Sequence, residues 1–254
     1  MIDLTSKTVL LTGSSSGIGF EIARALGRSG AYVIAHYSAN EAGAREATAE
    51  IPDDRKLLVR ADFSQPESSN KLWEDAVGWR GHIDVVISNA AVMPEAAMDG
   101  SDQQWNAAWD YALAVNVVQP AHLIRQAVSH FLATGGGTLV AISSWAAQRG
   151  AGNANLMAYS ASKAALAAMA KTVARVHAKD NVLVYLVAPG VVRTDMSVTS
   201  ARSQGGEEKV TASLAMGEWV PPSEIADLVT YLSSGSCRHL SGATLDVNGA
   251  SYVR

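Results

Sequence analysis

Tyr159 and Lys163 are the residue pair in this sequence whose types and spacing best suit proton-transfer chemistry. They stand four positions apart, so a helix there would bring both side chains to one face. A free tyrosine has a pKa of about 10 and exchanges protons poorly at neutral pH. A neighbouring ammonium would favour the phenolate and lower that pKa, as a general acid/base for a carbonyl–alcohol couple requires. Tyr–Lys pairs also occur by chance on protein surfaces, so this pair alone does not define a site.

A second candidate site is the glycine- and serine-rich turn from Thr12 to Gly19, which has the spacing G-x-x-x-G-x-G. It joins the apolar run Thr8 to Leu11 to a helical pattern over Ile18 to Arg28. The start of that helix would offer unpaired N–H groups and a positive dipole end to a pyrophosphate. A glycine turn without a ligand is the alternative. Its place between a strand and a helix favours dinucleotide binding.

The elements that must position these residues alternate between short β-rich runs and longer helical patterns. Several of the runs are continuously apolar, which is typical of strands buried on both faces of a parallel sheet. The expected strands are Thr8–Leu11, Tyr32–Ala35, Leu57–Val59, Ile83–Ile87, Thr138–Ile142, Val182–Val187 and Ala243–Val247. The expected helices include Ile18–Arg28, Leu72–Val77, Pro120–Leu132, Ala158–Ala178 and Ser223–Ser233.

The chain shows no low-complexity linker and no break in composition, so we expect one domain over residues 1–254. The segment Asp195 to Gly217 is the least regular and is rich in small polar residues. We expect it to form a mobile loop or a substrate lid.

The composition of the 254-residue chain excludes several classes of function. Apolar residues make up 48% and charged residues 17%, which excludes a disordered chain. The net charge of −4 leaves no basic surplus for a phosphate backbone, so we expect no nucleic-acid partner. No apolar run reaches the roughly 18 residues of a membrane span, so we expect no membrane association. Cys237 is the only cysteine, the histidines lack a metal-ligand pattern, and no secretory signal is seen, which predicts a cytoplasmic protein without a catalytic metal.

Together the motifs make the sequence resemble the short-chain dehydrogenase/reductase family, in its small single-domain branch. The resemblance extends from Lys7 to Gly249. It implies an α/β fold with a Rossmann-type doubly wound parallel sheet of about seven strands in three layers. It also implies hydride transfer between a nicotinamide cofactor and a carbonyl or secondary alcohol; a non-catalytic nucleotide-binding sensor is the alternative. The motifs that carry it are Thr12–Gly19, Asn89-Ala90-Ala91, Asn116, Ser143-Ser144, Tyr159–Lys163, Pro189-Gly190 with Thr194, and Gly242 with Asp246–Gly249.

The resemblance assigns catalytic roles to four residues. Ser144, with Ser143 as the neighbouring alternative, would hold the substrate oxygen. Tyr159 would be the general acid/base, and Lys163 would tune it and bind the nicotinamide ribose. Asn116 would support a water that links Lys163 to solvent, or would interrupt a helix and bond a backbone carbonyl; both roles are compatible.

The resemblance also assigns a set of cofactor contacts. Asp62 would contact the adenine, although a turn aspartate is the alternative, and Thr194 would orient the carboxamide. Ala91 departs from the family's Asn-Ala-Gly, and its methyl is tolerable if φ is negative. The full set is Gly13, Ser15, Ser16, Gly17, Ile18, Gly19, Tyr37, Ser38, Asp62, Phe63, Asn89, Ala90, Ala91, Tyr159, Lys163, Pro189, Gly190, Val192 and Thr194.

The choice of cofactor depends on the end of the second strand, where NAD-dependent relatives carry a carboxylate for the ribose 2′-hydroxyl. Tyr37 aligns with that carboxylate, and no acid follows until Glu41. This favours NADP(H), with NAD(H) as the alternative. The segments Ser14–Ser16 and His36–Asn40 supply no arginine or lysine for a 2′-phosphate. The donors left are Ser15, Ser38, Asn40 and, at low pH, His36.

Two further features concern the substrate and the assembly. Ser144 and Tyr159 are about two residues further apart than is usual in the family, which predicts an enlarged substrate-side loop. Arg149 and Arg193 are candidates to meet an anionic substrate, with solvated surface charges as the alternative.

The family pairs helices between subunits, so we expect a homotetramer, or else a homodimer, rather than a monomer whose helices only cover the sheet. The two apolar or small-residue faces are Leu123, Ile124, Ala127, Val128, Phe131 and Leu132, and Ala164, Ala165, Ala168, Met169, Thr172 and Val176.

Overall fold

Parallel strands form one seven-stranded sheet in the computed structural model, which describes residues 2–253. The strand order is β3-β2-β1-β4-β5-β6-β7, and every neighbouring pair is parallel. The chain runs outward from β1 to β3 and then crosses back to β4, so the carboxyl ends of β1 and β4 flank a crevice. The strands are β1 (Thr8–Leu11), β2 (Tyr32–Tyr37), β3 (Lys56–Arg60), β4 (Val85–Ser88), β5 (Gly137–Ile142), β6 (Val182–Pro189) and β7 (Thr244–Val247).

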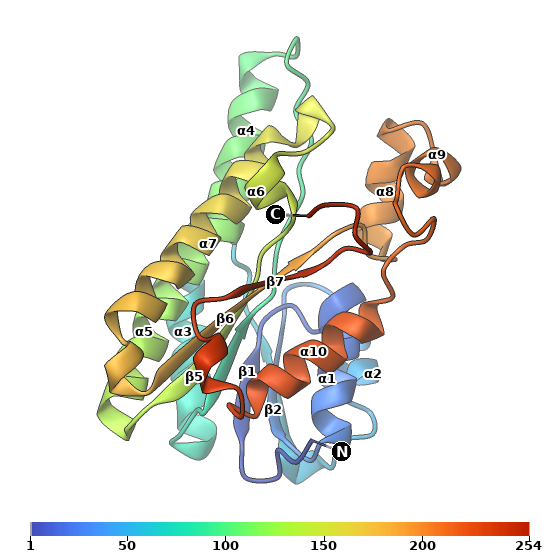
Figure 1. Ribbon diagram of the computed structural model, residues 1–254. Coiled ribbons are helices and arrows are strands. Elements are labelled where there is room, and N and C mark those ends of the chain that lie inside the picture. The colour runs from blue at the N-terminus through green and yellow to red at the C-terminus, as the bar shows by residue number, and fades with distance from the viewer. Residues whose placement is uncertain (1, 254) are drawn as a thin grey trace.

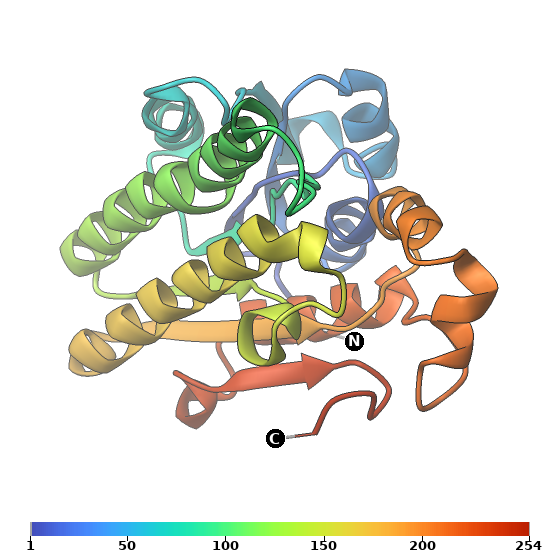
Figure 2. The ribbon, with the colours of Figure 1, turned by 90° about the horizontal axis from the view of Figure 1, so that it is seen from above.

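Helices cover both faces of the sheet and produce the expected three layers (Figures 1 and 2). One core contains Ile22 and Leu26 of α1 and Ile225 of α10. The opposite core contains Leu123 of α5 and Leu166 of α7. The first face carries α1 (Gly17–Arg28), α2 (Glu41–Ala47) and α10 (Pro222–Ser233), and the second carries α3 (Ser68–Arg80), α4 (Asp102–Leu113), α5 (Gln119–Thr134) and α7 (Met157–Val176).

The central strands are buried along their whole length because both faces are covered. β1, β4 and β6 consist entirely of buried residues, which explains their continuous apolar runs. β7 at the edge differs, since its residues are half-buried or exposed. The Rossmann-type doubly wound architecture is therefore confirmed.

Two helices were missing from the sequence prediction. The start of α4 is a capping box. The Ser101 hydroxyl accepts from the Gln104 N–H, and the Gln104 side-chain oxygen accepts from the Ser101 N–H. The S-x-x-Q spacing was a readable signal for this helix. α2 is short and half exposed, with only Ala44 and Ala47 buried, so its periodicity is weak. The remaining short elements are α6 (Ala146–Arg149), the π-helical turn η2 (Ala114–Val118), and the 3₁₀ turns η1 (Asp53–Arg55), η3 (Ala154–Leu156), η4 (Ala178–Asp180) and η5 (Arg238–Leu240).

The segment expected to be irregular is largely helical. It contains α8 (Asp195–Ser203) and α9 (Glu207–Ala212). The Thr194 hydroxyl caps α8 by accepting from the Ser197 N–H. This segment has a small apolar cluster of its own, which includes Val210, Leu214 and Trp219.

One of the two helix faces expected to be free for assembly is in fact part of the core. Leu123, Ile124, Ala127 and Phe131 of α5 are buried against the sheet, because their spacing matches the face that covers it. Leu132 remains 45% exposed. On α7, the residues Ala168, Thr172 and Val176 are exposed, and Ala164, Ala165 and Met169 are half-buried. Within residues 2–253, no helix is both long enough and apolar enough to cross a membrane.

Candidate active site

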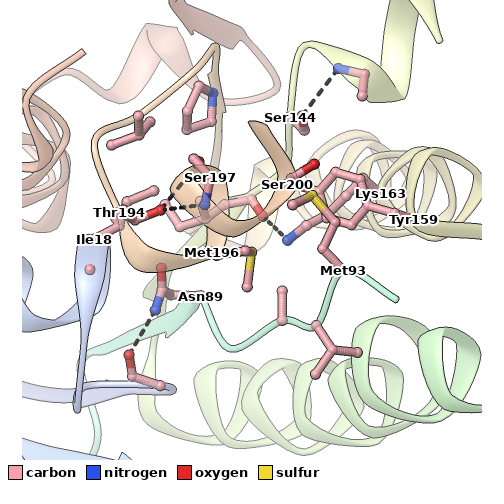
Figure 3. Close-up of a pocket in the computed structure, with 18 of the residues that line it drawn as sticks. Ile18, Asn89, Met93, Ser144, Tyr159, Lys163, Thr194, Met196, Ser197 and Ser200 are labelled. Carbon is pink, nitrogen blue, oxygen red and sulfur yellow. Dashed lines mark hydrogen bonds between the residues drawn. The ribbon is translucent and has the colours of Figure 1, made fainter. Parts of the chain in front are cut away.

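A cavity of about 510 Å³ lies at the carboxyl edge of the sheet and gathers the motifs into one place. Figure 3 shows Tyr159, Lys163, Asn89 and Thr194 around it, although they come from different elements. The expected site residues that line it are Gly13, Ser15, Ser16, Gly17, Ile18, Gly19, Ser38, Asp62, Phe63, Asn89, Ala90, Ala91, Ser144, Tyr159, Lys163, Pro189, Gly190, Val192 and Thr194.

The glycine turn between β1 and α1 leaves space where any other residue would place a side chain. Gly13 has a φ of +71°, and an added Cβ would lie 2.9 Å from the Ala90 Cα. A Cβ on Gly19 would lie 1.9 Å from the Gly13 carbonyl oxygen. The Ser16 side chain makes no capping bond to α1, and the first turn of α1 contains no acid. The start of α1 therefore fits the pyrophosphate of a dinucleotide.

Asn89 and Thr12 hold this turn in shape. The Asn89 Nδ2 donates to the carbonyl oxygens of Thr12 at 2.9 Å and Gly13 at 3.0 Å. The Thr12 hydroxyl donates to the Ile87 carbonyl and accepts from the Ala90 N–H. Both donor positions of the Asn89 amide are thus engaged in supporting the turn.

The Ala91 backbone has no strained conformation that would require glycine. Among residues 2–253, positive φ angles outside glycine occur only at Glu67, Asn181 and Ala250. The methyl group at Ala91 is therefore compatible with its backbone, although the family usually has glycine there.

His36 is a structural residue of this site that the sequence analysis assigned differently. Its Nδ1 accepts from the Gly13 N–H at 3.1 Å, and its Nε2 donates to the Ala61 carbonyl at 2.9 Å. The ring stacks on Phe63, with centroids 4.5 Å apart. Burial lowers the pKa of His36 to about 4. The expectation that His36 supplies a charge at low pH is corrected: the ring is neutral and ties the glycine turn to the end of β3.

The expected cofactor contact of Tyr37 is also corrected, because its side chain does not line the cavity. Successive side chains of a strand point to opposite faces, and Tyr37 points toward Glu41, to which it is hydrogen-bonded. Burial, followed by the Glu41 charge and this hydrogen bond, raises the pKa of Tyr37. Ser38, the next residue, does line the cavity.

Arg60 is a cation near this end of the cavity that the sequence analysis missed. It pairs with Tyr37 across β2 and β3, and its Nε donates to the Ser38 carbonyl at 3.2 Å. The Asp62 carboxylate accepts from the Ser64 N–H, and this bond, more than the Arg60 charge, lowers the pKa of Asp62. Asp62 is therefore a turn aspartate that also lines the cavity. No signal at the end of β2 could reveal Arg60, because it lies on the neighbouring strand.

Ser144 and Tyr159 meet at the centre of the cavity. The Ser144 side chain interacts with the Tyr159 hydroxyl and lowers its pKa, and the Ser144 Oγ accepts from the Ala146 N–H at 3.1 Å. The Ser143 hydroxyl instead donates to the Lys163 backbone carbonyl at 3.2 Å. Of the two neighbouring serines, Ser144 is therefore the one whose hydroxyl faces Tyr159.

Lys163 lies one turn further along α7 and is only 3% exposed. Its Nζ donates to the Ile142 carbonyl at 2.8 Å and lies 6.0 Å from the centroid of the Tyr159 ring. Burial lowers the pKa of Lys163 to about 8. Burial raises the pKa of Tyr159, and the interaction with Ser144 only partly opposes this. The net pKa of Tyr159 therefore lies above its ordinary value while Lys163 is held against a backbone carbonyl, and the lowering by the ammonium stays a prediction.

Asn116 lies in the π-helical turn η2 and is fully engaged behind the cavity. Its Oδ1 accepts from the Val92 N–H, and its Nδ2 donates to the Val92 carbonyl and to the Ser162 hydroxyl. The Ser162 hydroxyl donates to the Tyr159 carbonyl at 2.7 Å. Asn116 thus interrupts the helix and bonds a backbone carbonyl, which fixes the loop after β4 to α7.

The other half of the cavity has less regular walls. The longer stretch between Ser144 and Tyr159 lines it with Trp145 and Leu156, and Arg149 stacks on the Trp145 ring at 4.1 Å. Met93 and Met196 also point into this half (Figure 3). Arg193, by contrast, is paired with the Glu207 carboxylate at 2.6 Å and stacks on Trp219.

A glycine turn at the switch point of a doubly wound sheet, beside a half-buried tyrosine with a buried serine and a buried lysine, defines a dinucleotide-binding oxidoreductase. Comparisons with known proteins agree and supply the family. Residues 13–250 match the family model described as enoyl-(acyl carrier protein) reductase. The chain belongs to the short-chain dehydrogenase/reductase family.

Three relatives illustrate the match. Dehydrogenase/reductase SDR family member 4 of Bos taurus is 32% identical over 98% of this chain and 88% of its own length. A Beutenbergia cavernae protein, proposed to be an NAD(P)-dependent gluconate 5-dehydrogenase and solved with NADP at low occupancy, is 29% identical. It has a TM-score of 0.87 over 98% of both chains. The 3-oxoacyl-(acyl-carrier-protein) reductase of Agrobacterium tumefaciens C58, solved with NADP, is 28% identical, with a TM-score of 0.85 over 97% of this chain and 95% of its own.

These findings establish the class of activity. The protein is an NAD(P)-dependent oxidoreductase that acts on a small molecule, and the comparisons give no support to a non-catalytic sensor. The glycine turn and the start of α1 are the part of the chain that fits the cofactor pyrophosphate.

Proposed function

We propose that the protein interconverts a carbonyl compound and a secondary alcohol, with Tyr159 as general acid/base and Ser144 holding the substrate oxygen. The observation that carries this proposal is that Ser144 and Tyr159 both line the cavity beside the buried Lys163, with Ser144 near enough to lower the pKa of the Tyr159 hydroxyl. The bound nicotinamide supplies or accepts the hydride. A carbonyl oxygen that contacts both hydroxyls would be polarised by Ser144 and would receive its proton from Tyr159.

The raised pKa of Tyr159 supports its role as proton donor at neutral pH. A phenol whose pKa lies above its ordinary value keeps its proton and is ready to donate it to a developing alkoxide. Oxidation requires the phenolate as base, so it should become faster as the pH rises. The Lys163 ammonium, with a pKa of about 8, would stabilise the phenolate that remains after donation.

Asn116 has a supporting role in this proposal. Through Ser162 it fixes the Tyr159 backbone carbonyl, and through Val92 it fixes the cavity wall. The proton relay from Lys163 to solvent that the family resemblance implies for Asn116 stays a prediction.

We further propose that NADP(H) is preferred over NAD(H). Ser38 lines the adenosine end of the cavity, and the Arg60 guanidinium is bonded to its carbonyl. Glu41, the nearest acid in sequence, is bonded to Arg45 and Tyr37, and these bonds lower the pKa of Glu41. A cation beside the ribose attracts a 2′-phosphate. The NADP found in two solved relatives supports the same preference.

For assembly, we propose a homotetramer, with a homodimer as the alternative. Tyr111 and Val118 are each 45% exposed and Val176 is 64% exposed, which supports pairing of α4, η2 and α7 with a second copy. The half-exposed edge strand β7 supports a second contact. A single 26.6 kDa species in light scattering, fully active at micromolar concentration, would contradict this.

Side chains of the one sheet pack into both cores, which supports a single domain over residues 1–254. A cytoplasmic location is supported by the lone, unpaired Cys237.

The experiment that tests the activity is a substrate panel. Oxidation of NADPH and NADH is followed at neutral pH with 3-oxoacyl thioesters, cyclic ketones and keto-sugar acids. We expect at least one carbonyl class to be reduced, faster with NADPH. The absence of turnover in both directions with every class would contradict the proposed activity.

A further inference from the structure

The helices α8 and α9 form a flap that is joined to the rest of the fold along a narrow base. The base is an isolated parallel bridge between Val192 and Val220. The Arg193 N–H donates to the Val220 carbonyl at 3.0 Å, and the Val220 N–H donates to the Val191 carbonyl at 2.9 Å. The flap, residues 193–219, has an apolar cluster separate from the two main cores; outside the flap, Trp145 and Val191 pack against this cluster, and Ser251 accepts from the Ala215 N–H at 3.0 Å. A segment with its own core and both ends at one bridge can move as a body.

The position of this flap determines the shape of the substrate half of the cavity. Met196, Ser200 and Gln204 of α8 and Val210 of α9 all line it. Figure 3 shows Met196, Ser197 and Ser200 of the flap around the same cavity as Met93 and Tyr159. A small rotation about the base would therefore widen the space for the substrate beside Tyr159.

The far side of the flap is held by the carboxylate of Glu95, in the loop after β4. Its Oε1 accepts from the Ser203 hydroxyl at 2.9 Å and from the Ser200 hydroxyl at 3.3 Å. The Asn153 Nδ2 donates to the same Ser203 hydroxyl at 3.3 Å. Hydrogen bonds to an ionised acceptor are stronger than those between neutral groups.

Packing alone does not fix α8 on this side. A second cavity lies between the flap and the loop after β4, lined by Met93, Glu95, Met196 and Ser203 among others. Apolar contacts are lost wherever such space remains, so the polar contacts of Glu95 carry more of the attachment. Three segments that wall the substrate site thus meet around Ser203: α8, the loop after β4 through Glu95, and the loop after β5 through Asn153.

We propose that Glu95 is a positioning residue that latches the flap over the substrate site and sets the affinity for substrate. Glu95 acts through α8, which it holds, and leaves the proton-transfer chemistry of Tyr159 unaltered. The kinetic part of this proposal rests on the proposed function, whereas the structural part does not.

The test compares Glu95→Ala with Glu95→Gln and with Glu208→Ala, a control at an exposed acid on α9 of the same flap. Limited trypsin digestion measures cleavage after Arg202, an exposed residue of α8, and steady-state kinetics measure KM and kcat. We expect Glu95→Ala to be cut about tenfold faster and to have a KM about tenfold higher, while kcat changes less than about twofold. Glu95→Gln should restore most of the resistance to trypsin and most of the substrate affinity, because its amide oxygen accepts the same two hydrogen bonds. Glu208→Ala should match the unmodified protein in both measurements.

A second variant tests whether Glu95 acts through α8. Ser203→Ala should mimic Glu95→Ala, because each substitution removes the hydrogen bond between the Ser203 hydroxyl and the Glu95 carboxylate. The double variant should therefore be little worse than either single variant. Unchanged cleavage in Glu95→Ala, equal effects of Glu95→Gln and Glu95→Ala, or additive effects of Glu95→Ala and Ser203→Ala would overturn the latch. If the unmodified protein reduces no carbonyl compound, the proposed function fails, and the cleavage rates still decide the latch.

Discussion

In the cofactor half of the cavity, buried side chains tie the ends of neighbouring strands to one another. His36 joins the glycine turn to the end of β3, and Asn89 joins it to the end of β4. In the substrate half, the walls are loops and the flap, and exposed polar groups such as Glu95 and Ser203 make the connections. The shape of the cofactor half is thus fixed for one class of ligand. The loops and the flap that wall the substrate half can move, or differ in sequence, without disturbing the sheet.

The contrast agrees with the two solved relatives, which both contain NADP while their names point to different substrates. The residues proposed for catalysis lie at the boundary, because Ser144 follows a buried strand and Tyr159 lies in the first turn of a long packed helix. Substitutions on the cofactor side and at the boundary should therefore have larger effects than those on the substrate side.

The largest effect is expected at the boundary itself. Tyr159→Phe removes the hydroxyl that interacts with Ser144 and keeps the ring, so turnover should fall about a thousandfold or more. The affinity for NADPH, measured by its fluorescence, should change less than about threefold. Substantial turnover in this variant would contradict the role of Tyr159.

The pH dependence of stability should report on His36. Its pKa is lowered to about 4 in the fold, so the unfolded chain takes up a proton first as the pH falls. Its stabilisation is complete above the unfolded pKa of about 6.5 and is lost as the pH falls toward 4, by about 3 kcal/mol. Between pH 7 and pH 4, urea unfolding should show a smaller loss in the free energy of unfolding for His36→Gln than for the unmodified protein. Equal losses in the two proteins would rule out this effect, and the exposed His239 provides the control substitution.

A matched pair of glycines compares the two halves directly. In Gly19→Ala, the new Cβ would overlap the Gly13 carbonyl, so NADPH should bind roughly thirtyfold more weakly, or about 2 kcal/mol. Gly152 lines the substrate half and has nothing within 4 Å of an added Cβ, so Gly152→Ala should bind NADPH normally. Isothermal titration of both variants, after circular dichroism has established folding, measures the difference. Similar affinities would contradict the contrast between the halves.

A smaller effect is expected at Arg60. Arg60→Gln should reduce the ratio of kcat/KM for NADPH over NADH by about tenfold, since one charge-assisted contact to a phosphate is lost. Arg45→Gln removes a nearby cation that is paired with Glu41 and should change the ratio much less. An unchanged ratio in Arg60→Gln would place the recognition of the 2′-phosphate elsewhere. Because Ser38, and not Tyr37, lines the cavity, Ser38→Asp is the substitution that should favour NADH.

Much of the fold followed from local sequence patterns. The β-rich runs located all seven strands, and the central strands read as continuous apolar runs because both of their faces are covered. α2 and α4 were missed, since exposed helices with few buried residues show weak periodicity. The segment after Thr194 was expected to be irregular because small polar residues dominate it, yet capping by Thr194 and its own apolar cluster make it helical.

The sequence by itself determined the family, the glycine turn and the four residues proposed for catalysis, because these depend on residue type and on spacing along the chain. Only the tertiary structure decided that Ser144 rather than Ser143 faces Tyr159, that Tyr37 turns away from the cavity, and that Arg60 approaches it. It also decided that burial governs the pKa values of Tyr159 and Lys163. The burial of a side chain, its direction and the identity of the neighbouring strand all depend on contacts between residues far apart in the chain. No local sequence pattern contains this information.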